Sequence, residues 1–157
     1  MENNIIKMFI MDVDGTLTDG KIYIGEHGEL FKTFNVKDGY GIDLLKKHGI
    51  IPVIITGRKS NIVLQRAKEL GIQEVYQGIN NKIEVYEELK EKYRLLDNEI
   101  AYIGDDLNDL ALMRKVGIKF TVANCANELS EIADFKSHLN GGEGAVRDAI
   151  NHLLNKK

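Results

Sequence analysis

The stretch IIKMFIMDVDGT, residues 5–16, decides the fold of this chain. It opens with a short apolar run, Ile5–Met11, that only Lys7 interrupts, and the run ends at two aspartates, Asp12 and Asp14. Apolar runs of this length without alternation are typical of strands covered on both faces of a parallel sheet. The run is too short for a signal peptide or a membrane span, so we expect a buried strand and no membrane partner.

Further apolar runs follow, and segments with helical periodicity lie between them. The predicted strands are Ile5–Met11, Ile51–Ile55, Glu74–Tyr76, Ile100–Ile103 and Ile118–Val122. The helical patterns cover residues 62–70, 83–93 and 146–154. Ser60 precedes the first of these helices as an N-cap, and Gly71 ends it. Strands that alternate with crossover helices predict an α/β fold with a doubly wound, Rossmann-like parallel sheet.

One segment breaks this alternation and predicts a β-hairpin flap over about residues 20–35. Lys21–Ile24 and Glu29–Asn35 flank a turn, residues 25–28, that has a glycine at each end. The apolar residues of the flap fall on both of its faces: Ile22, Ile24, Leu30, Phe31 and Phe34. Because an isolated hairpin is at best marginally stable in water, we expect another surface to cover it.

Composition bounds the remaining possibilities. The 157 residues fit one domain, residues 1–157, with a C-terminal tail over about residues 137–157. The net charge of −3 and the lack of a basic run argue against a nucleic-acid partner. The single cysteine, Cys125, and the absence of zinc-site spacing fit a reducing, cytoplasmic location.

Polar residues follow four of the predicted strands, where ligands bind in open α/β sheets. They are Asp12, Asp14, Thr56, Gly57, Arg58, Gln77, Gly78, Lys82, Gly104, Asp105 and Asp106. Carboxylates that converge at one sheet edge repel one another unless a hard cation neutralises them, and Mg²⁺ prefers such oxygen ligands. The sequence therefore predicts Mg²⁺ as a cofactor.

This set of residues suits phosphoryl transfer. Asp12 can attack phosphorus and form an aspartyl-phosphate, which divides the hydrolysis into two displacements. Asp14, two residues on, can protonate the leaving oxygen and later deprotonate the attacking water. Thr56 and Lys82 can contact the phosphoryl oxygens, and Asp105 would complete the metal site.

Each of these residues also has an ordinary structural interpretation. An Asp-x-Asp-Gly segment is common in turns, and Thr56-Gly57 could be one more turn. Asp105 and Asp106 could cap a helix that begins near Leu107, and Lys82 could be a solvated helix residue. All of these interpretations would have to coincide at four strand ends, so we favour the catalytic one.

In this order, the residues resemble the haloacid dehalogenase superfamily: the segment DVDGT at 12–16, then Thr56, Lys82 and the segment GDDLND at 104–109. The resemblance implies that Mg²⁺ is held by the carboxylates of Asp12 and Asp105 and the backbone carbonyl of Asp14. It also implies that Asp106 and Asp109 support the site from nearby. Many members carry a cap domain, but the intervals on either side of Thr56 have no room for one.

At finer grain the chain resembles the capless 3-deoxy-D-manno-octulosonate 8-phosphate phosphatases, through residues 38–41, 57–58 and 141–147. The resemblance implies a small phosphorylated sugar acid as substrate and a homotetramer whose flaps assemble and whose tails reach a neighbour's site. The implied substrate-binding residues are Thr16, Gly39, Gly57, Arg58, Lys82 and Arg147.

Two alternatives remain beside this resemblance. Sialic-acid-type 9-phosphate phosphatases, acting on N-acylneuraminate or the related deaminated sugar, look similar but have an acidic residue where this chain has Arg58. Receiver-type signalling modules also combine an acidic Mg²⁺ site with a phosphorylated aspartate, a threonine and a lysine. In such modules the acidic pair precedes the phosphorylated aspartate, whereas Asp105 and Asp106 follow Asp12 here, and this order argues against signalling.

Overall fold

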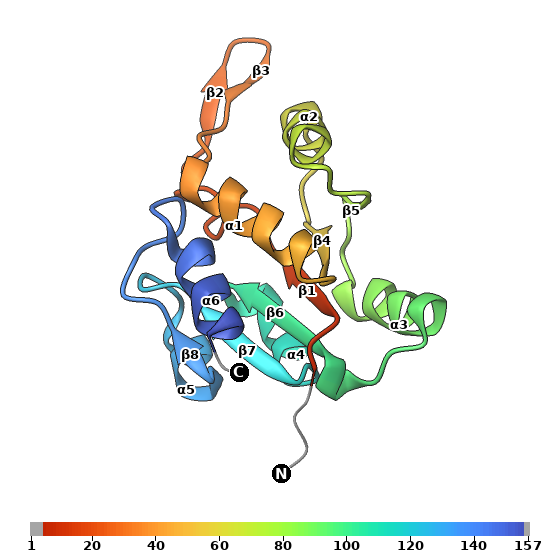
Figure 1. Cartoon of the computed structure of the whole chain (residues 1–157). Helices are drawn as coiled ribbons and strands as arrows, with labels where there is room; N and C mark the ends of the chain where they lie inside the picture. The colour runs from red at the N-terminus through yellow and green to blue at the C-terminus, as the bar shows by residue number, and fades with distance from the viewer. Residues whose placement is uncertain (1–4, 156–157) are drawn as a thin grey trace.

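The apolar run that ends at Asp12 forms the third strand of a six-stranded parallel sheet, in the order β5-β4-β1-β6-β7-β8 (Figure 1). The computed structural model describes residues 5–155. The strands are β1 (Met8–Met11), β4 (Ile51–Ile55), β5 (Glu74–Tyr76), β6 (Ile100–Gly104), β7 (Ile118–Thr121) and β8 (Phe135–Lys136). β1 pairs with β4 on one side and β6 on the other, so its end lies between theirs.

Helices cover both faces of the sheet, as the unbroken apolar strands predict. Phe9 and Met11 pack into the core on one face, and Met8 and Ile10 pack into the core on the other. The first face is covered by α1 (Val36–Lys47), α2 (Asn61–Leu70) and α6 (Ala145–Leu154). The second is covered by α3 (Lys82–Tyr93), α4 (Leu110–Met113) and α5 (Asn127–Ile132). The doubly wound fold is confirmed.

Several element bounds differ from the predicted ones. β1 begins at Met8 and β7 ends at Thr121, while β6 extends to Gly104. The edge strand β8 was not predicted, because two residues carry no readable alternation. The helix expected near Leu107 begins as a short 3-10 turn, η2 (Leu107–Asp109), and a similar turn, η1 (Asp97–Glu99), precedes β6.

The flap is a separate two-stranded antiparallel hairpin of β2 (Tyr23–Gly25) and β3 (Gly28–Phe31), which projects from the rest of the molecule (Figure 1). Both strands are shorter than predicted. The rings of Tyr23 and Phe31 stack with centroids 4.4 Å apart. Phe34 packs against the main core, but the other apolar flap residues named above are exposed.

Ser60 differs from its prediction in an informative way. Helix α2 does begin after Ser60 and end at Gly71, whose positive φ of 70° closes it. The Ser60 side chain, however, makes no capping hydrogen bond. Its hydroxyl instead donates to the Glu29 carboxylate of the flap at 2.6 Å. The hydroxyl therefore joins the flap to the start of α2.

The glycine-rich tail packs against the loop that follows β1 in its own chain. The backbone N–H of Gly142 donates to the carbonyl of Thr16 at 3.2 Å. A Cβ at Gly141 would lie 1.8 Å from the carbonyl oxygen of Gly15, so only glycine fits there. Residues 1–4 and 156–157 of the predicted domain and tail lie outside the described residues. Within residues 5–155 no helix is long and apolar enough to cross a membrane.

Candidate active site

The carboxyl ends of three adjacent strands bring the predicted residues together. Asp12 follows β1, Thr56 follows β4 and Asp105 follows β6. A cavity of about 280 Å³ opens at this edge of the sheet. It is lined by Asp12, Asp14, Gly20, Thr56, Gly57, Arg58, Asp105, Asp106 and Asn108. Of the four predicted strand ends, the third does not line this cavity, but its Lys82 donates a hydrogen bond to Asp12.

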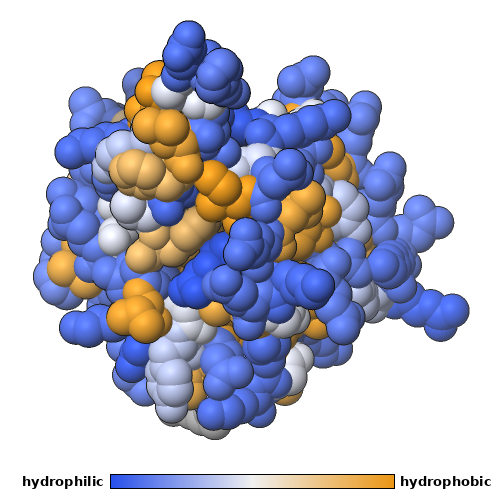
Figure 2. Space-filling model, turned by 90° about the horizontal axis from the view of Figure 1, so that it is seen from above, coloured by the Kyte–Doolittle hydropathy of each residue, from blue (hydrophilic) through white to orange (hydrophobic). Residues whose placement is uncertain are grey.

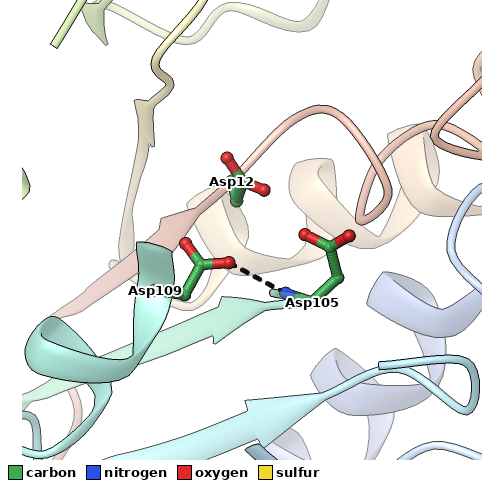
Figure 3. A group of neighbouring side chains, drawn as sticks. All are labelled: Asp12, Asp105 and Asp109. Atoms are coloured by element: carbon green, nitrogen blue, oxygen red, sulfur yellow. Dashed lines mark hydrogen bonds between the residues drawn. The ribbon is translucent and has the colours of Figure 1, made fainter. Parts of the chain in front are cut away.

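Three carboxyl groups form an acidic cluster at this edge of the sheet (Figure 3), and two of them line the cavity. Asp12, Asp105 and Asp109 each offer an oxygen, and these oxygens lie within 4.8 Å of one another. Burial, and after it the charge of Asp109, raises the pKa of Asp12 well above its ordinary value. Burial also raises the pKa of Asp105 to about 6. The cluster therefore resists holding all of its negative charges without a cation.

Asp109 is already saturated with hydrogen bonds. Its Oδ1 accepts from Lys82 at 2.8 Å and from the hydroxyl of Tyr102. Its Oδ2 accepts from the backbone N–H groups of Asp105 at 2.9 Å, drawn in Figure 3, and of Asp106 at 3.2 Å. A carboxylate has about four acceptor positions, so none remains for a metal ion. These hydrogen bonds are compatible with the predicted role of Asp109 as a support of the site, which stays a prediction.

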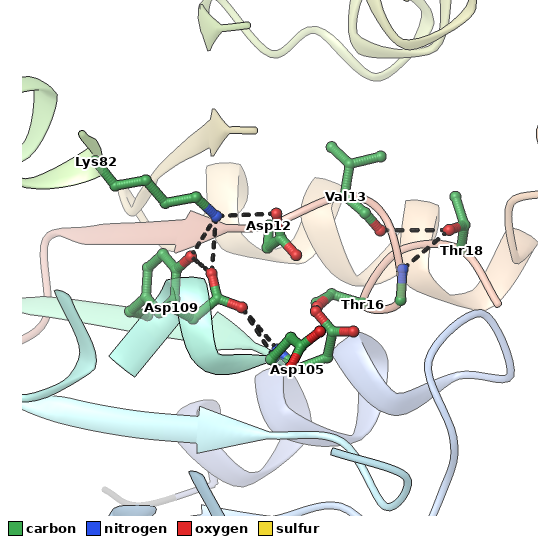
Figure 4. Close-up of polar contacts among 10 residues, drawn as sticks. Asp12, Val13, Thr16, Thr18, Lys82, Asp105 and Asp109 are labelled. Atoms are coloured by element: carbon green, nitrogen blue, oxygen red, sulfur yellow. Dashed lines mark hydrogen bonds and ion pairs between the residues drawn. The ribbon is translucent and has the colours of Figure 1, made fainter. Parts of the chain in front are cut away.

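Lys82 is the first residue of α3, yet only 5% of its side chain is exposed. Its ammonium lies 3.0 Å from Oδ1 of Asp12, and it also donates to Asp109 and, at 3.1 Å, to the Tyr102 hydroxyl (Figure 4). Burial works against the charge, but the carboxylates of Asp12 and Asp109 raise the pKa of Lys82 above its ordinary value. The alternative interpretation of Lys82 as a solvated helix residue is therefore excluded. Its ammonium is a positive charge beside Asp12.

The residues that remain unsaturated fit a Mg²⁺ ion. Asp12 uses Oδ1 for Lys82, and the Asp105 carboxylate receives a 3.5 Å contact from the Thr16 hydroxyl and interacts with the Asp12 carboxyl group. Three carboxyl groups face one ammonium, and oxygen donors of this kind suit Mg²⁺. A Cβ at Gly15 would lie 1.9 Å from Oδ2 of Asp105, so the space beside that carboxylate depends on glycine.

The loop between Asp12 and Thr18 is fixed by its own hydrogen bonds (Figure 4). The backbone N–H of Gly15 donates to the Thr18 hydroxyl at 3.2 Å, and that hydroxyl lies 3.5 Å from the Val13 carbonyl. Within this loop the Thr16 hydroxyl contacts the Asp105 carboxylate. The predicted contact of Thr16 with substrate stays a prediction.

The Asp14 carboxylate stands apart from the acidic cluster. It is not among the three clustered groups, and its Oδ1 pairs with the ammonium of Lys32 at 2.7 Å. This separation is what the predicted division of labour requires, because a proton-transferring carboxyl must stay off the metal. Lys32 comes from the flap and was not predicted.

Three other predicted residues have different surroundings. Asp106 caps η2, since its Oδ1 accepts from the N–H of Leu107 at 2.8 Å. Arg147 lies against α1, where its N–H donates to Asp38 at 2.9 Å and its guanidinium lies 5.3 Å from the centre of the Tyr40 ring. Gly39 lies beside Arg66, which a Cβ would meet at 2.7 Å. Neither Gly39 nor Arg147 lines the cavity of its own chain, so their substrate contacts stay predictions.

Sequence reasoning missed two residues of the site, Tyr102 and Lys32. Tyr102 was read as one more apolar position of its strand, although a hydroxyl in a fully buried run needs a partner. Lys32 carries no sequence signal, because a lysine in a hairpin is usually solvated.

The doubly wound sheet with acidic strand ends is the architecture of one class of hydrolase. Residues 73–150 match the family model of the haloacid dehalogenase-like hydrolases. The 3-deoxy-D-manno-octulosonate 8-phosphate phosphatase KdsC of Salmonella typhimurium is 46% identical over 149 residues, which are 95% of this chain and 79% of that protein. The corresponding protein of Yersinia pestis is 42% identical and covers 95% of this chain and 80% of its own.

Solved structures agree with these relatives. The phosphatase of Yersinia pestis superposes with a TM-score of 0.92 at 42% identity, covering 95% of this chain and 80% of that one. The 3-deoxy-D-manno-octulosonate 8-phosphate phosphatase of Moraxella catarrhalis, in complex with magnesium ion, phosphate ion and a KDO molecule, has a TM-score of 0.91 at 43% identity. The match covers 95% of this chain and 86% of that one. The chain belongs to the family of 3-deoxy-D-manno-octulosonate 8-phosphate phosphatases within the haloacid dehalogenase-like hydrolases.

Proposed function

We propose that this chain is a Mg²⁺-dependent phosphatase that hydrolyses 3-deoxy-D-manno-octulosonate 8-phosphate to the free sugar and phosphate. One observation carries the proposal beyond family membership: Asp12 is fixed by Lys82 at the base of an open cavity, beside Asp105 and apart from Asp14. A nucleophile, a proton carrier and a cation site in this arrangement are the parts that phosphomonoester hydrolysis needs.

The residues divide the reaction into two displacements. In the first, a carboxylate oxygen of Asp12 bonds to phosphorus as the bond from phosphorus to the sugar oxygen breaks, and Asp14 gives that oxygen a proton. In the second, water bonds to phosphorus, Asp14 takes its proton, and the bond between Asp12 and phosphorus breaks. Lys82 and Thr56 stabilise the phosphoryl oxygens. When bound by Asp12, Asp105 and the Asp14 carbonyl, Mg²⁺ would neutralise charge on the same oxygens.

A substrate panel tests this proposal. The enzyme with Mg²⁺ is expected to release phosphate from 3-deoxy-D-manno-octulosonate 8-phosphate faster than from N-acylneuraminate-type 9-phosphates. Arg58 is exposed at the cavity wall, where the 9-phosphate phosphatases have an acidic residue, and this difference favours the octulosonate as substrate. Asp12→Asn is expected to abolish turnover. Undiminished turnover by that variant would refute the mechanism, and a preference for the 9-phosphates would refute the substrate.

We also propose that the enzyme is a homotetramer in the cytoplasm, assembled through the flap. Figure 2 shows apolar side chains gathered on the face that carries the flap, and Ile24 and Leu30 are 69% and 62% exposed. The free cysteine, Cys125, is compatible with a reducing compartment. Light scattering at micromolar concentration is expected to give four times the chain mass. Ile24→Asp is expected to lower that mass, whereas Leu96→Asp, at a similarly exposed position (65%) outside the flap, leaves it unchanged.

A further inference from the structure

Four polar side chains, Asp14, Lys32, Glu29 and Ser60, connect the edge of the active site to the flap and to the start of α2. The Lys32 ammonium lies 2.7 Å from Oδ1 of Asp14 and 2.9 Å from Oε1 of Glu29. The other oxygen of Glu29 accepts from the Ser60 hydroxyl at 2.6 Å. Asp14 follows β1 and Ser60 precedes α2, so these four side chains join the loop after β1 to the start of α2 by way of the flap.

Lys32 is buried in a way that a surface lysine is not. Only 5% of its side chain is exposed, whereas Lys21, at the other end of the same hairpin, is exposed. A buried ammonium is tolerated only where carboxylates compensate its desolvation, and Lys32 has two of them. Its place between Asp14 and Glu29 is therefore specific.

The Ser60 end of these four side chains is also specific. The Ser60 hydroxyl is the group that would cap α2, and the cap bond is absent while the bond to Glu29 is present. The flap is thereby held to the start of α2, and Glu29 in turn fixes the ammonium of Lys32 from the side opposite Asp14.

We propose that Lys32 is a positioning residue for Asp14, and that its ion pair, braced by Glu29 and Ser60, keeps the Asp14 carboxylate out of the metal cluster and over the cavity. The inference rests on the proposed function of Asp14 as the proton carrier. In the proposed function the Asp14 backbone carbonyl would bind the cation, so an unrestrained Asp14 side chain could turn toward the cation and become a ligand. Lys32 offers it a competing positive charge on the correct side.

The test compares two substrates in Lys32→Met. With 3-deoxy-D-manno-octulosonate 8-phosphate, whose alkoxide leaving group needs a proton, kcat is expected to fall at least tenfold while KM changes less than threefold. With p-nitrophenyl phosphate, whose leaving group needs no proton, the variant is expected to release one p-nitrophenol per active site rapidly. The slow turnover that follows reflects the second displacement, in which Asp14 must accept a proton. Asp14→Asn is the reference for this pattern.

Three controls separate positioning from a general structural role. Lys21→Met, in the same flap, is expected to leave kcat for both substrates unchanged. Lys32→Arg is expected to retain most of the kcat that Lys32→Met loses. Glu29→Gln keeps an acceptor for Ser60 but removes one charge beside Lys32, and it is expected to show the same burst pattern with a smaller loss. This variant serves as the test if Lys32→Met does not fold.

Two results would overturn the inference. One is a kcat of Lys32→Met, or of Glu29→Gln where that variant stands in, within twofold of the wild type. The other is an equal loss in the burst and in the later turnover. A wild-type enzyme that hydrolyses p-nitrophenyl phosphate but not the octulosonate phosphate would contradict the proposed substrate alone, since the burst still reports on Lys32.

Discussion

The ammonium of Lys82 lies 3.0 Å from Oδ1 of Asp12, and both side chains are almost completely buried. The pair fixes one oxygen of Asp12. It also links Asp12 to Asp109, because the same ammonium lies 2.8 Å from that carboxylate. Asp12 and the turn after β6 are therefore held by one ammonium group.

Replacing Lys82 by methionine tests this link. Two buried carboxylates would lose their partner, and breaking such an ion pair costs about 3–5 kcal/mol of unfolding free energy. Loss of one charged donor at the phosphoryl group is expected to lower kcat by about 10²- to 10³-fold. Urea denaturation and steady-state kinetics measure the two effects. Lys115→Met, which removes an exposed pair with Glu87, is the control and should cost about 1 kcal/mol or less.

Metal binding should depend on Asp105 and not on its neighbour Asp106. Mg²⁺ at a hundred times its dissociation constant is expected to stabilise the enzyme by about 2.7 kcal/mol, and EDTA should remove this gain together with activity. Asp105→Asn is expected to lose the Mg²⁺-dependent shift in melting temperature, while Asp106→Asn, which changes the cap of η2 and a charge at the cavity but no proposed metal ligand, retains it. Equal shifts in the two variants would exclude Asp105 as a ligand.

Gly15 can be tested against another glycine with a similar backbone. Gly15 has φ of 87° and Gly49 has φ of 74°, but a Cβ at Gly49 would meet nothing within 4 Å. Both alanine variants carry the strain of a left-handed residue, roughly 1–2 kcal/mol. Only Gly15→Ala is expected to lose activity and Mg²⁺ binding, because its Cβ collides with Asp105. If Gly49→Ala loses activity equally, the cause is backbone strain and not the collision.

Asp38 should make stability depend on pH. Burial raises its pKa to about 6 from an ordinary value of 3.8, although the N–H of Arg147 donates to it. The folded protein therefore holds the proton of Asp38 more tightly than the unfolded chain does. The resulting contribution to the free energy of unfolding is lost as pH rises from about 4 to about 6.

Asp38→Asn should remove this dependence. Relative to the variant, the wild type is expected to lose up to about 3 kcal/mol of unfolding free energy over that interval and to change little above it. Denaturant titrations of both proteins at a series of pH values give the difference directly. A difference that grows in the opposite direction would contradict the raised pKa.

The strand ends could be predicted from the sequence because strands buried on both faces are apolar, and the first polar residue after each one marks its end. Each of these apolar runs stops where a polar residue begins, and this pattern predicts Asp12, Thr56 and Asp105 at one edge of the sheet. Lys82 was predicted in the same way, from its place after the third apolar run, although a lysine at the start of a helix is usually solvated.

What the sequence did not reveal depends on tertiary contacts. The Ser60 hydroxyl donates to Glu29, a residue distant in the chain, instead of capping its own helix. No sequence pattern around Ser60 predicts this contact. Lys32 is buried only because two carboxylates meet it, and Tyr102 has a polar role only because Asp109 lies next to its hydroxyl. Such partners are defined by the fold.

The saturation of Asp109 has a consequence for the energetics of turnover. Its four donors come from three elements, β6, α3 and the turn after β6, and all four are in place in the free enzyme. A polar shell that is already oriented does not have to rearrange as charge moves onto the phosphoryl oxygens. The cost of orienting these donors is therefore met when the protein folds, and the donors do not have to reorient during the reaction.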